Sequence, residues 1–341
     1  MNAKDLMMEM SALTAVSGRE EAMARYLEEK LAPLGPVERL ANHSVACRIA
    51  PVREGRPHLM LDAHLDEIGM MVTCLEEEGF LRVGACGGID RRLLMASQVT
   101  VHAAGGDYPG VIASIPPHLQ KGEDASRVPE MDDILVDVGY TGQRLRELFA
   151  PGDLVTLDHK TLQLQNGRLA SKALDDRAGC AAILLAAERF AALAPDYGVT
   201  AVFSSMEELG SQGARTAAYA VNPTHAVTVD VSFGVAPGVS RREAGEIGAG
   251  PMIGISPILD HALTSRLIAL AQREGIPFQR EVMAGNTSTN ADVIATTRGG
   301  VKTALVSIPQ RNMHTPVEVM LPQDVEDTAR LIALLAKEEL A

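Results

Sequence analysis

The chain has 341 residues, a formal net charge of −13 and a pI near 5.2. Its length exceeds the usual size of one hydrophobic core, so we expect two domains. The excess of acidic residues argues against nucleic acid or an anionic membrane surface as a partner.

The cysteines and the N-terminal stretch bear on the cellular compartment. Cys47, Cys74, Cys86 and Cys180 include no C-x-x-C pair, so we expect reduced, mostly buried thiols. The opening MNAKDLMMEM lacks the pattern of a secretory signal. No apolar run reaches the ~18 residues that a membrane-spanning helix needs. We therefore predict a soluble, cytoplasmic protein.

The first part of the chain predicts one helix and two strands. Ser17-Gly-Arg-Glu20 has the pattern of a capping box and is expected to open an amphipathic helix that runs through Leu31. Strands are expected at about 45–50 and 58–63, and the second has the continuous apolar centre of a buried strand. This strand leads directly into His64-Leu65-Asp66-Glu67.

The pattern changes between residues 68 and 164. Short β-like runs are separated by Gly and Pro turns, at 69–74, 80–83, 98–103, 110–115, 134–138 and 154–157, and only 143–149 has a helical pattern. Gly84-Ala-Cys-Gly87-Gly88 is expected to be a turn and does not fit a dinucleotide fingerprint. We predict a β-rich domain of residues 68–164, inserted into a domain made of residues 1–67 and 165–341.

Helices and strands alternate after Leu169. Helices are expected after Asp176 and at 212–220, 262–274, 290–298 and 324–339, with strands at 199–204, 226–229, 278–282 and 303–308. This alternation predicts an α/β fold, a mixed sheet with helices on both faces.

Candidate metal ligands fall at the ends of the predicted strands and at the start of the first long helix. They are His64 and Asp66, Asp175 and Asp176, Glu207 and Glu208, Asp230, and His314. Ligands of open α/β sheets collect beyond the carboxyl ends of the strands, so these side chains should converge on one edge. Carboxylate and imidazole together suit zinc, cobalt or manganese.

Each residue alone has an ordinary interpretation. An Asp before a helix is a common N-cap, Glu207-Glu208 could be an exposed acidic turn, and His314 could be a surface loop residue. The joint placement favours a metal site, because a cluster of acids with few bases would repel itself without a cation.

The motifs resemble those of the tetrahedral (TET) aminopeptidase family, dinuclear-metal enzymes of clan MH. The resemblance runs from about Leu13 to Leu335 and is carried by His64-Leu-Asp66-Glu-Ile-Gly69, Lys172-Ala-Leu-Asp175-Asp176-Arg-Ala-Gly179, Glu207-Glu208-Leu-Gly210, Asp230-Val231 and His314-Thr-Pro316-Val-Glu318. It implies a zinc-peptidase-like catalytic domain. It also implies that the inserted domain mediates dimerisation and that dimers build a homododecamer.

The resemblance also implies residue roles. Asp175 would bridge two divalent ions, zinc or cobalt with manganese as a further option. His64 and Asp230 would complete one metal site, and Glu208 and His314 the other. Glu207 would be the general base and acid, and Asp66 would orient His64. The peptide bond between Asp175 and Asp176 is often cis in this clan.

One position departs from the family pattern: Thr289-Asn290 stands where the family usually has Thr-Asp. A changed recognition of the substrate and no effect at all both remain open. Arg241 and Arg242 lie in a loop after the Asp230 strand, where they could favour acidic substrates or be solvated surface.

The expected function is removal of N-terminal residues from short peptides by a metal-activated water. Two alternatives remain: an N-acyl amino acid or peptide deacylase that uses the same metal site, and a catalytically silent assembly protein. The silent protein would need a broken ligand set, and the five predicted ligand positions are intact.

Overall fold

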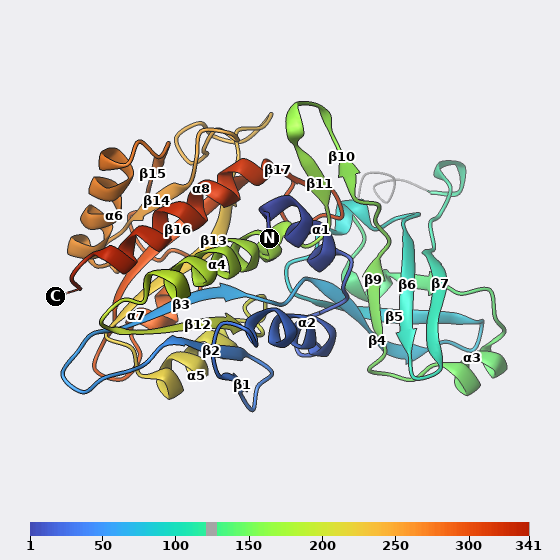
Figure 1. The fold of residues 1–341 in the computed structure, drawn as a ribbon. Coiled ribbons are helices and arrows are strands. Elements are labelled where there is room, and N and C mark those ends of the chain that lie inside the picture. Colours follow the sequence, from blue (N-terminus) through green and yellow to red (C-terminus); the bar gives the residue numbers. More distant parts are fainter. Residues whose placement is uncertain (121–127, 341) are drawn as a thin grey trace.

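An eight-stranded mixed sheet and a closed six-stranded β-barrel form the two frameworks of the computed structural model (Figure 1). The structure describes residues 1–120 and 128–340. The sheet with its helices and the inserted antiparallel barrel confirm the predicted fold class. The two frameworks lie beside each other, with the N-terminal helix α1 near their junction (Figure 1).

The sheet has the strand order β1-β2-β12-β3-β13-β16-β14-β15. Its central strands β12, β3, β13 and β16 are parallel neighbours, so their carboxyl ends meet at one edge. The strand bounds are β1 Val37–Arg39, β2 Val45–Ala50, β3 His58–His64, β12 Gly198–Ser204, β13 His225–Phe233, β14 Met252–Ile255, β15 Gln279–Val282 and β16 Lys302–Gln310. The four predicted strands near the site are confirmed, whereas β1 and β14 were not foreseen.

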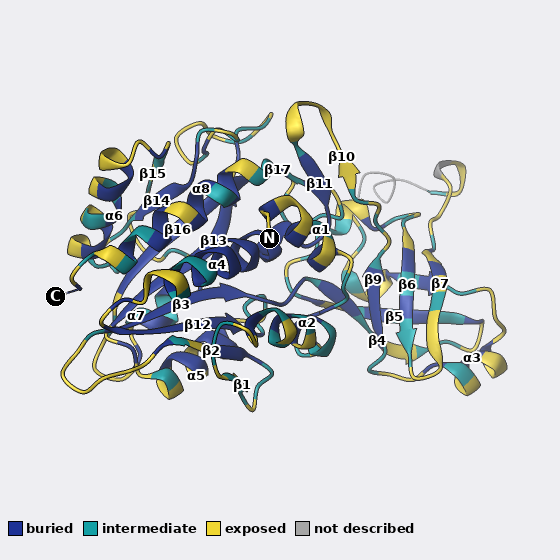
Figure 2. Ribbon diagram, viewed as in Figure 1, coloured by how far each residue is buried: buried dark blue, intermediate teal, exposed yellow. Residues whose placement is uncertain are grey.

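Helices cover both faces of the sheet. One face packs on a large apolar cluster with α1 (Ala3–Ser11), α2 (Glu21–Leu31), α4 (Leu174–Leu193), α6 (His261–Arg273) and α8 (Pro322–Ala333). The other face carries α5 (Gln212–Val221) and α7 (Ala291–Ala295). The Ala- and Leu-rich α4 is buried along nearly its whole length (Figure 2). This burial fixes the first turn of α4 near the carboxyl ends of the central strands.

The barrel is built from short antiparallel strands in the order β4-β5-β8-β7-β6-β9. Its elements are β4 Gly69–Leu75, β5 Phe80–Cys86, β6 Gln98–Ala103, β7 Gly106–Ile112, β8 Leu135–Asp137, α3 Gly142–Leu148 and β9 Leu154–Leu157. Each overlaps a predicted run. The core is apolar, with Met70, Val101 and Val155 among its fully buried side chains.

A third, three-stranded sheet, which was not foreseen, joins β10 (Leu162–Gln163), β11 (Leu169–Ser171) and β17 (Glu318–Met320). The four cysteines are unpaired, and all but Cys74 are buried. None of the helices in the described part of the chain is long and apolar enough to cross a membrane.

The capping box expected at Ser17–Glu20 is wrong. Helix α2 begins at Glu21, and its N-cap Glu20 makes no side-chain capping bond. Ser17 instead donates to Asp66, and Glu20 accepts backbone hydrogen bonds from Gly18 and Met206. Both side chains serve the loops near the sheet edge, because buried acids and loop amides there need partners more than the helix does.

Candidate metal centre

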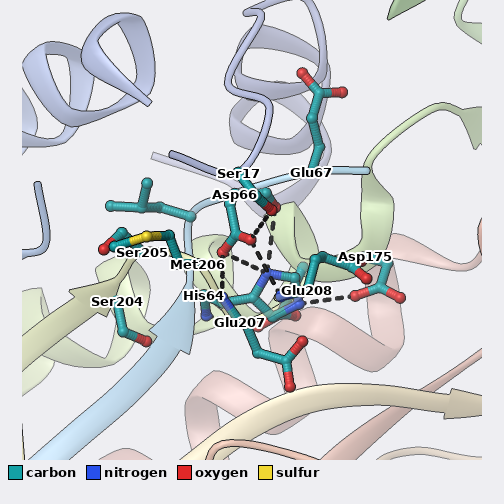
Figure 3. Close-up of polar contacts among 12 residues, drawn as sticks. Ser17, His64, Asp66, Glu67, Asp175, Ser204, Ser205, Met206, Glu207 and Glu208 are labelled. Atoms are coloured by element: carbon teal, nitrogen blue, oxygen red, sulfur yellow. Dashed lines mark hydrogen bonds and ion pairs between the residues drawn. The ribbon is translucent and has the colours of Figure 1, made fainter. Parts of the chain in front are cut away.

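His64 stands at the last position of β3, with only 1% of its surface exposed. Its Nε2 lies 2.9 Å from Asp175 Oδ1, and its Nδ1 lies 3.2 Å from the carbonyl oxygen of Asp66. Figure 3 shows the imidazole between the two aspartates. The backbone partner of Nδ1 leaves Nε2 directed at the place where Asp175 and its neighbours meet.

Asp66 organises the loops around His64. Its carboxylate accepts hydrogen bonds from Ser17 Oγ at 2.5 Å and from the backbone N–H groups of Glu207 at 3.0 Å and Glu208 at 3.2 Å (Figure 3). The Nδ1 of His64 is 3.4 Å from the same carboxylate. One buried acid therefore fixes the imidazole and the acidic loop that follows β12 in a single arrangement.

The two adjacent aspartates at the start of α4 have different tasks. Asp176 Oδ1 accepts a hydrogen bond from the N–H of Gly179 at 2.8 Å and so caps the helix. A Cβ at Gly179 would lie 2.4 Å from the Asp176 oxygens, so this position requires glycine. Asp175, which precedes the cap, is directed at two imidazoles. The peptide bond between the aspartates is cis, as the family resemblance implied.

Two groups of donors share Asp175. His64, Asp175 and Asp230 form one group, and Asp175, Glu208 and His314 form the other; within each, the ligand atoms lie within 4.8 Å of one another. His314 Nε2 is 3.4 Å from Asp175 Oδ2 and 3.3 Å from Glu208 Oε1. The five side chains that the sequence singled out as metal ligands are thus brought together, although they come from five separate segments.

Glu318 binds the backbone of two proposed ligands, a role that its sequence motif did not reveal. Its Oε2 accepts a hydrogen bond from Asp175 N at 3.0 Å, and its Oε1 accepts one from His314 N at 2.9 Å. Its position four residues after His314, within the His314 to Glu318 motif, was the available signal. Glu318 sets the backbone of two proposed ligands at once.

Burial dominates the electrostatics of the cluster. It raises the pKa values of Asp230, Asp176 and Glu318 well above the ordinary range, and neighbouring carboxylates add to the effect. Burial opposes the charged form of Asp175 too, but the imidazoles of His314 and His64 hold its pKa below the ordinary value. Hydrogen bonds to Asp175 and Glu208 raise the pKa of His314 to about 11. So many buried acids beside two bases need a cation to stay charged.

Glu207 belongs to neither donor group and lines the cavity beside them. The cavity has a volume of about 490 Å³ and is bordered by His64, Asp175, Glu208, Asp230 and His314. Burial raises the pKa of Glu207 to about 7, and the carboxylates of Glu208, Asp175 and Asp66 add to this while His64 opposes it. A carboxyl group that belongs to neither donor group but lies next to both is typical of a general base.

Two further sequence positions have a clear place. Asn290 is buried, and its Nδ2 donates to Asp62 Oδ2 at 3.0 Å and to Ser204 Oγ at 2.8 Å. Asn290 therefore supports the sheet and does not line the cavity. Its neighbour Thr289 does line the cavity. Arg242 lines the cavity, whereas Arg241 lies outside it and pairs with the exposed Glu246.

The donor set fits divalent metal ions. It consists of carboxylate oxygens and imidazole nitrogens, which suit zinc, cobalt and manganese, and one carboxylate is placed to serve two neighbouring ions. The mixed sheet, the strand-edge donors and the acid beside them, Glu207, define the class: a metal-dependent hydrolase of the α/β type.

Comparison with known proteins identifies the family within this class. The family model described as M42 glutamyl aminopeptidase matches residues 44–331. The lysyl aminopeptidase of Pyrococcus furiosus is 33% identical over 293 residues, 85% of this chain and 84% of that protein. The chain belongs to the M42 glutamyl aminopeptidase family and is a metallo-aminopeptidase, a hydrolase that acts on peptide bonds.

Solved structures agree. The TET aminopeptidase from the marine sediment archaeon Thaumarchaeota archaeon SCGC AB-539-E09 has a TM-score of 0.92 and 28% identity, covering 99% of this chain and 97% of that one. The TET1 peptidase of Pyrococcus horikoshii, which can assemble into a tetrahedron or a large octahedral shell, has a TM-score of 0.86 and 27% identity, covering 98% and 99%. The family inferred from the motifs is confirmed.

Proposed function

We propose that His64, Asp175, Asp230, Glu208 and His314 bind two divalent ions, zinc or cobalt or else manganese, and that the enzyme removes single residues from the N-termini of short peptides. The observation that carries this assignment is the sharing of Asp175 between two donor groups of suitable chemistry. When bound, two such ions would lower the pKa of a water between them and polarise the scissile carbonyl.

Glu207 is the general base and acid in this proposal. It borders the cavity next to Glu208, and its backbone N–H is fixed by Asp66, so its carboxyl group is positioned without being used as a ligand. It would accept the proton of the attacking water and pass that proton to the leaving amine. Asp66 acts through His64 and the loop, as a positioning residue.

The free α-amine of the substrate is the expected determinant of where cleavage occurs. A cavity lined by several carboxylates offers partners for an ammonium group, which would place the first peptide bond at the attacking water. Orientation of this kind can contribute several kcal/mol, within the ~7–11 kcal/mol ceiling for oriented reactions. Acetylation would remove the charge and add bulk at the same point.

The test compares one short peptide with its N-acetyl form by mass spectrometry, using the enzyme with its full complement of metal. We expect stepwise release of single residues from the free peptide and little or no hydrolysis of the acetylated one. Comparable removal of the acetyl group would favour the deacylase, internal fragments would indicate an endopeptidase, and no reaction with either would favour the silent assembly protein.

The barrel, residues 68–164 in our division, is proposed to mediate dimerisation, and the dimers to build a dodecamer that admits only short or unfolded peptides. Large apolar side chains exposed on this region, Val111, Ile115 and Leu119, support an interface, as does the assembly of the Pyrococcus horikoshii relative. Light scattering should find a large particle. A fully active monomer at micromolar concentration would contradict the proposal.

We place the enzyme in the cytoplasm, since its four cysteines are free and three are buried. No nucleic acid and no membrane surface is proposed as a partner, in keeping with the net charge of −13.

A further inference from the structure

Two acidic residues of the cavity, Glu243 and Glu281, stand apart from the metal centre and from Glu207, and Glu243 is exposed. Glu281 lies on β15, the last strand of the sheet, and both of its carboxylate oxygens are held by serine hydroxyls. Ser307 Oγ donates to Oε2 at 2.6 Å, and Ser232 Oγ donates to Oε1. Ser307 is only 1% exposed and Ser232 only 7%, so the Glu281 carboxylate contacts buried groups that line the cavity.

The serines also place this carboxylate next to the metal centre. Ser232 follows Asp230 by two residues on β13, so the two side chains are on the same face of the strand. Ser307 on β16 is the direct register partner of Asp230 on β13. A substrate with its first carbonyl at the metal centre would therefore extend its N-terminal side chain toward Glu281.

The surroundings of Glu281 define what this side chain should be. Met252 and Leu305 contribute apolar surface to the cavity, and Met252 is the strand partner of Ser307. The described side chains give the Glu281 carboxylate two hydroxyl partners and no cationic one. An apolar wall that ends at an unneutralised carboxylate is complementary to a long aliphatic chain that ends in a cation.

Positive groups also border the cavity, but they lie further out. Arg280 and Arg242 are both exposed, in contrast to the half-buried Glu281. Arg280 precedes Glu281 directly on β15, so its side chain leaves the opposite face of the strand. The burial of each charged group, more than the number of such groups, therefore decides which one interacts most strongly with the substrate side chain. A less solvated charge is less screened.

We infer, on the basis of the proposed aminopeptidase function, that Glu281 is a specificity residue that selects peptides with lysine or arginine at the N-terminus. Ser232 and Ser307 hold the carboxylate in place for the cationic end of that side chain. The aliphatic part of the side chain lies along Met252 and Leu305.

The first experiment uses the wild-type enzyme, loaded with metal, and aminoacyl chromogenic substrates. Lysyl and norleucyl substrates share the aliphatic chain and differ in the terminal ammonium, so the ratio of their kcat/KM values isolates the charge. We expect a ratio above ten in favour of lysine, with arginine alongside it and glutamate the poorest. A ratio near one would overturn the inference. A preference for glutamate would overturn it too, and would indicate that Arg242 or Arg280 contacts the substrate side chain.

The second experiment changes the carboxylate itself. Glu281→Gln keeps an oxygen that accepts from a serine hydroxyl, and it should lower the lysyl-to-norleucyl ratio at least tenfold. Glu281→Lys should make glutamyl substrates better than lysyl ones. Glu246→Gln, which removes a negative charge from the exposed loop outside the cavity, is the matched control and should leave the ratio unchanged. An unchanged ratio in Glu281→Gln would overturn the inference.

The outcomes separate this inference from the function beneath it. If no substrate with a free amine is cleaved, the proposed function fails. If free-amine substrates are cleaved without regard to the ammonium of lysine, the function stands and the role of Glu281 is wrong. Inhibition of the wild-type enzyme by free lysine and norleucine gives the same comparison without a variant, and equal inhibition would count against the inference.

Discussion

The edge of the mixed sheet and the core of the barrel bury very different side chains. At the sheet edge five polar side chains are at most 6% exposed: His64, Asp66, Asp175, Asp230 and Glu318. In the described residues between β4 and β9, by contrast, Thr156 is the single buried polar side chain. An apolar core needs no partner, whereas each buried acid costs free energy unless it is paired. The barrel is thus built for stability and shape, and the sheet edge for chemistry.

The strongest test of this contrast is removal of the shared acid. Asp175→Ala should lose both ions and all measurable activity, because one carboxylate serves both donor groups. Elemental analysis and peptide hydrolysis measure the two effects. Asp133→Ala, which removes an exposed aspartate of the barrel region, should change neither. Two tightly held ions in Asp175→Ala would sink the assignment.

A smaller effect is expected at Glu207, which the proposal uses for proton transfer alone. Glu207→Gln should keep the fold and both ions while turnover falls by ~10²–10⁴-fold, the usual contribution of general acid–base catalysis. Metal content and kcat, measured on the same sample, separate the role of the base from that of a ligand. Near-normal turnover would show that another group moves the proton.

The barrel does reach the metal centre through the two glycines that follow β5, which the next test exploits. A Cβ at Gly88, just beyond β5, would lie 2.8 Å from Nδ1 of His314. Because His314 is a proposed ligand, Gly88→Ala should displace the imidazole and lower kcat/KM, on the order of tenfold, an effect typical of displaced metal-site geometry. Gly84→Ala in the same segment, where the added Cβ meets only a methyl group of Thr73 at 3.2 Å, is the matched control. Equal activity of the two variants would mean that the barrel does not affect the geometry of the metal centre.

The alternation of elements and the strand-end positions of the ligands could be predicted, because both follow from periodicity and from short motifs. Each of the central parallel strands was found within a few residues. The two strands of the eight-stranded sheet that were missed, β1 and β14, are short pieces beside longer neighbours. Such strands depend on pairing across the sheet more than on their own sequence.

Support from distant segments could not be predicted. Ser17 has the spacing of a capping box, and only its contact with Asp66, 49 residues away, shows its actual role. The glycine turn at Gly87-Gly88 had an ordinary local interpretation, and its approach to His314 appears only when the barrel is placed beside the sheet. Local patterns report on local hydrogen bonds, and tertiary demands override them where buried groups need partners.

The smallest effect separates the cost of burying a titratable group from catalysis. His58 is at the opposite end of β3 from His64, 5% exposed, with Nε2 2.8 Å from Thr200 Oγ1. Burial, with a smaller contribution from Arg48, lowers its pKa to about 4. In the unfolded chain the pKa of a histidine is ~6.5, so between these two values the unfolded state binds a proton that the folded state does not.

Folded stability should therefore be lost as the pH falls from about 6.5 toward 4, while above ~6.5 His58 contributes no pH dependence. His58→Gln removes this component, so its free energy of unfolding should fall less than that of the wild type between pH 7 and pH 5, by about 1–2 kcal/mol. Urea unfolding at the two pH values measures the difference. His118→Gln, which removes an exposed histidine of the barrel region, is the control for loss of an imidazole. The same pH dependence in His58→Gln and the wild type would mean that the acids at the sheet edge alone set the acid sensitivity of this fold.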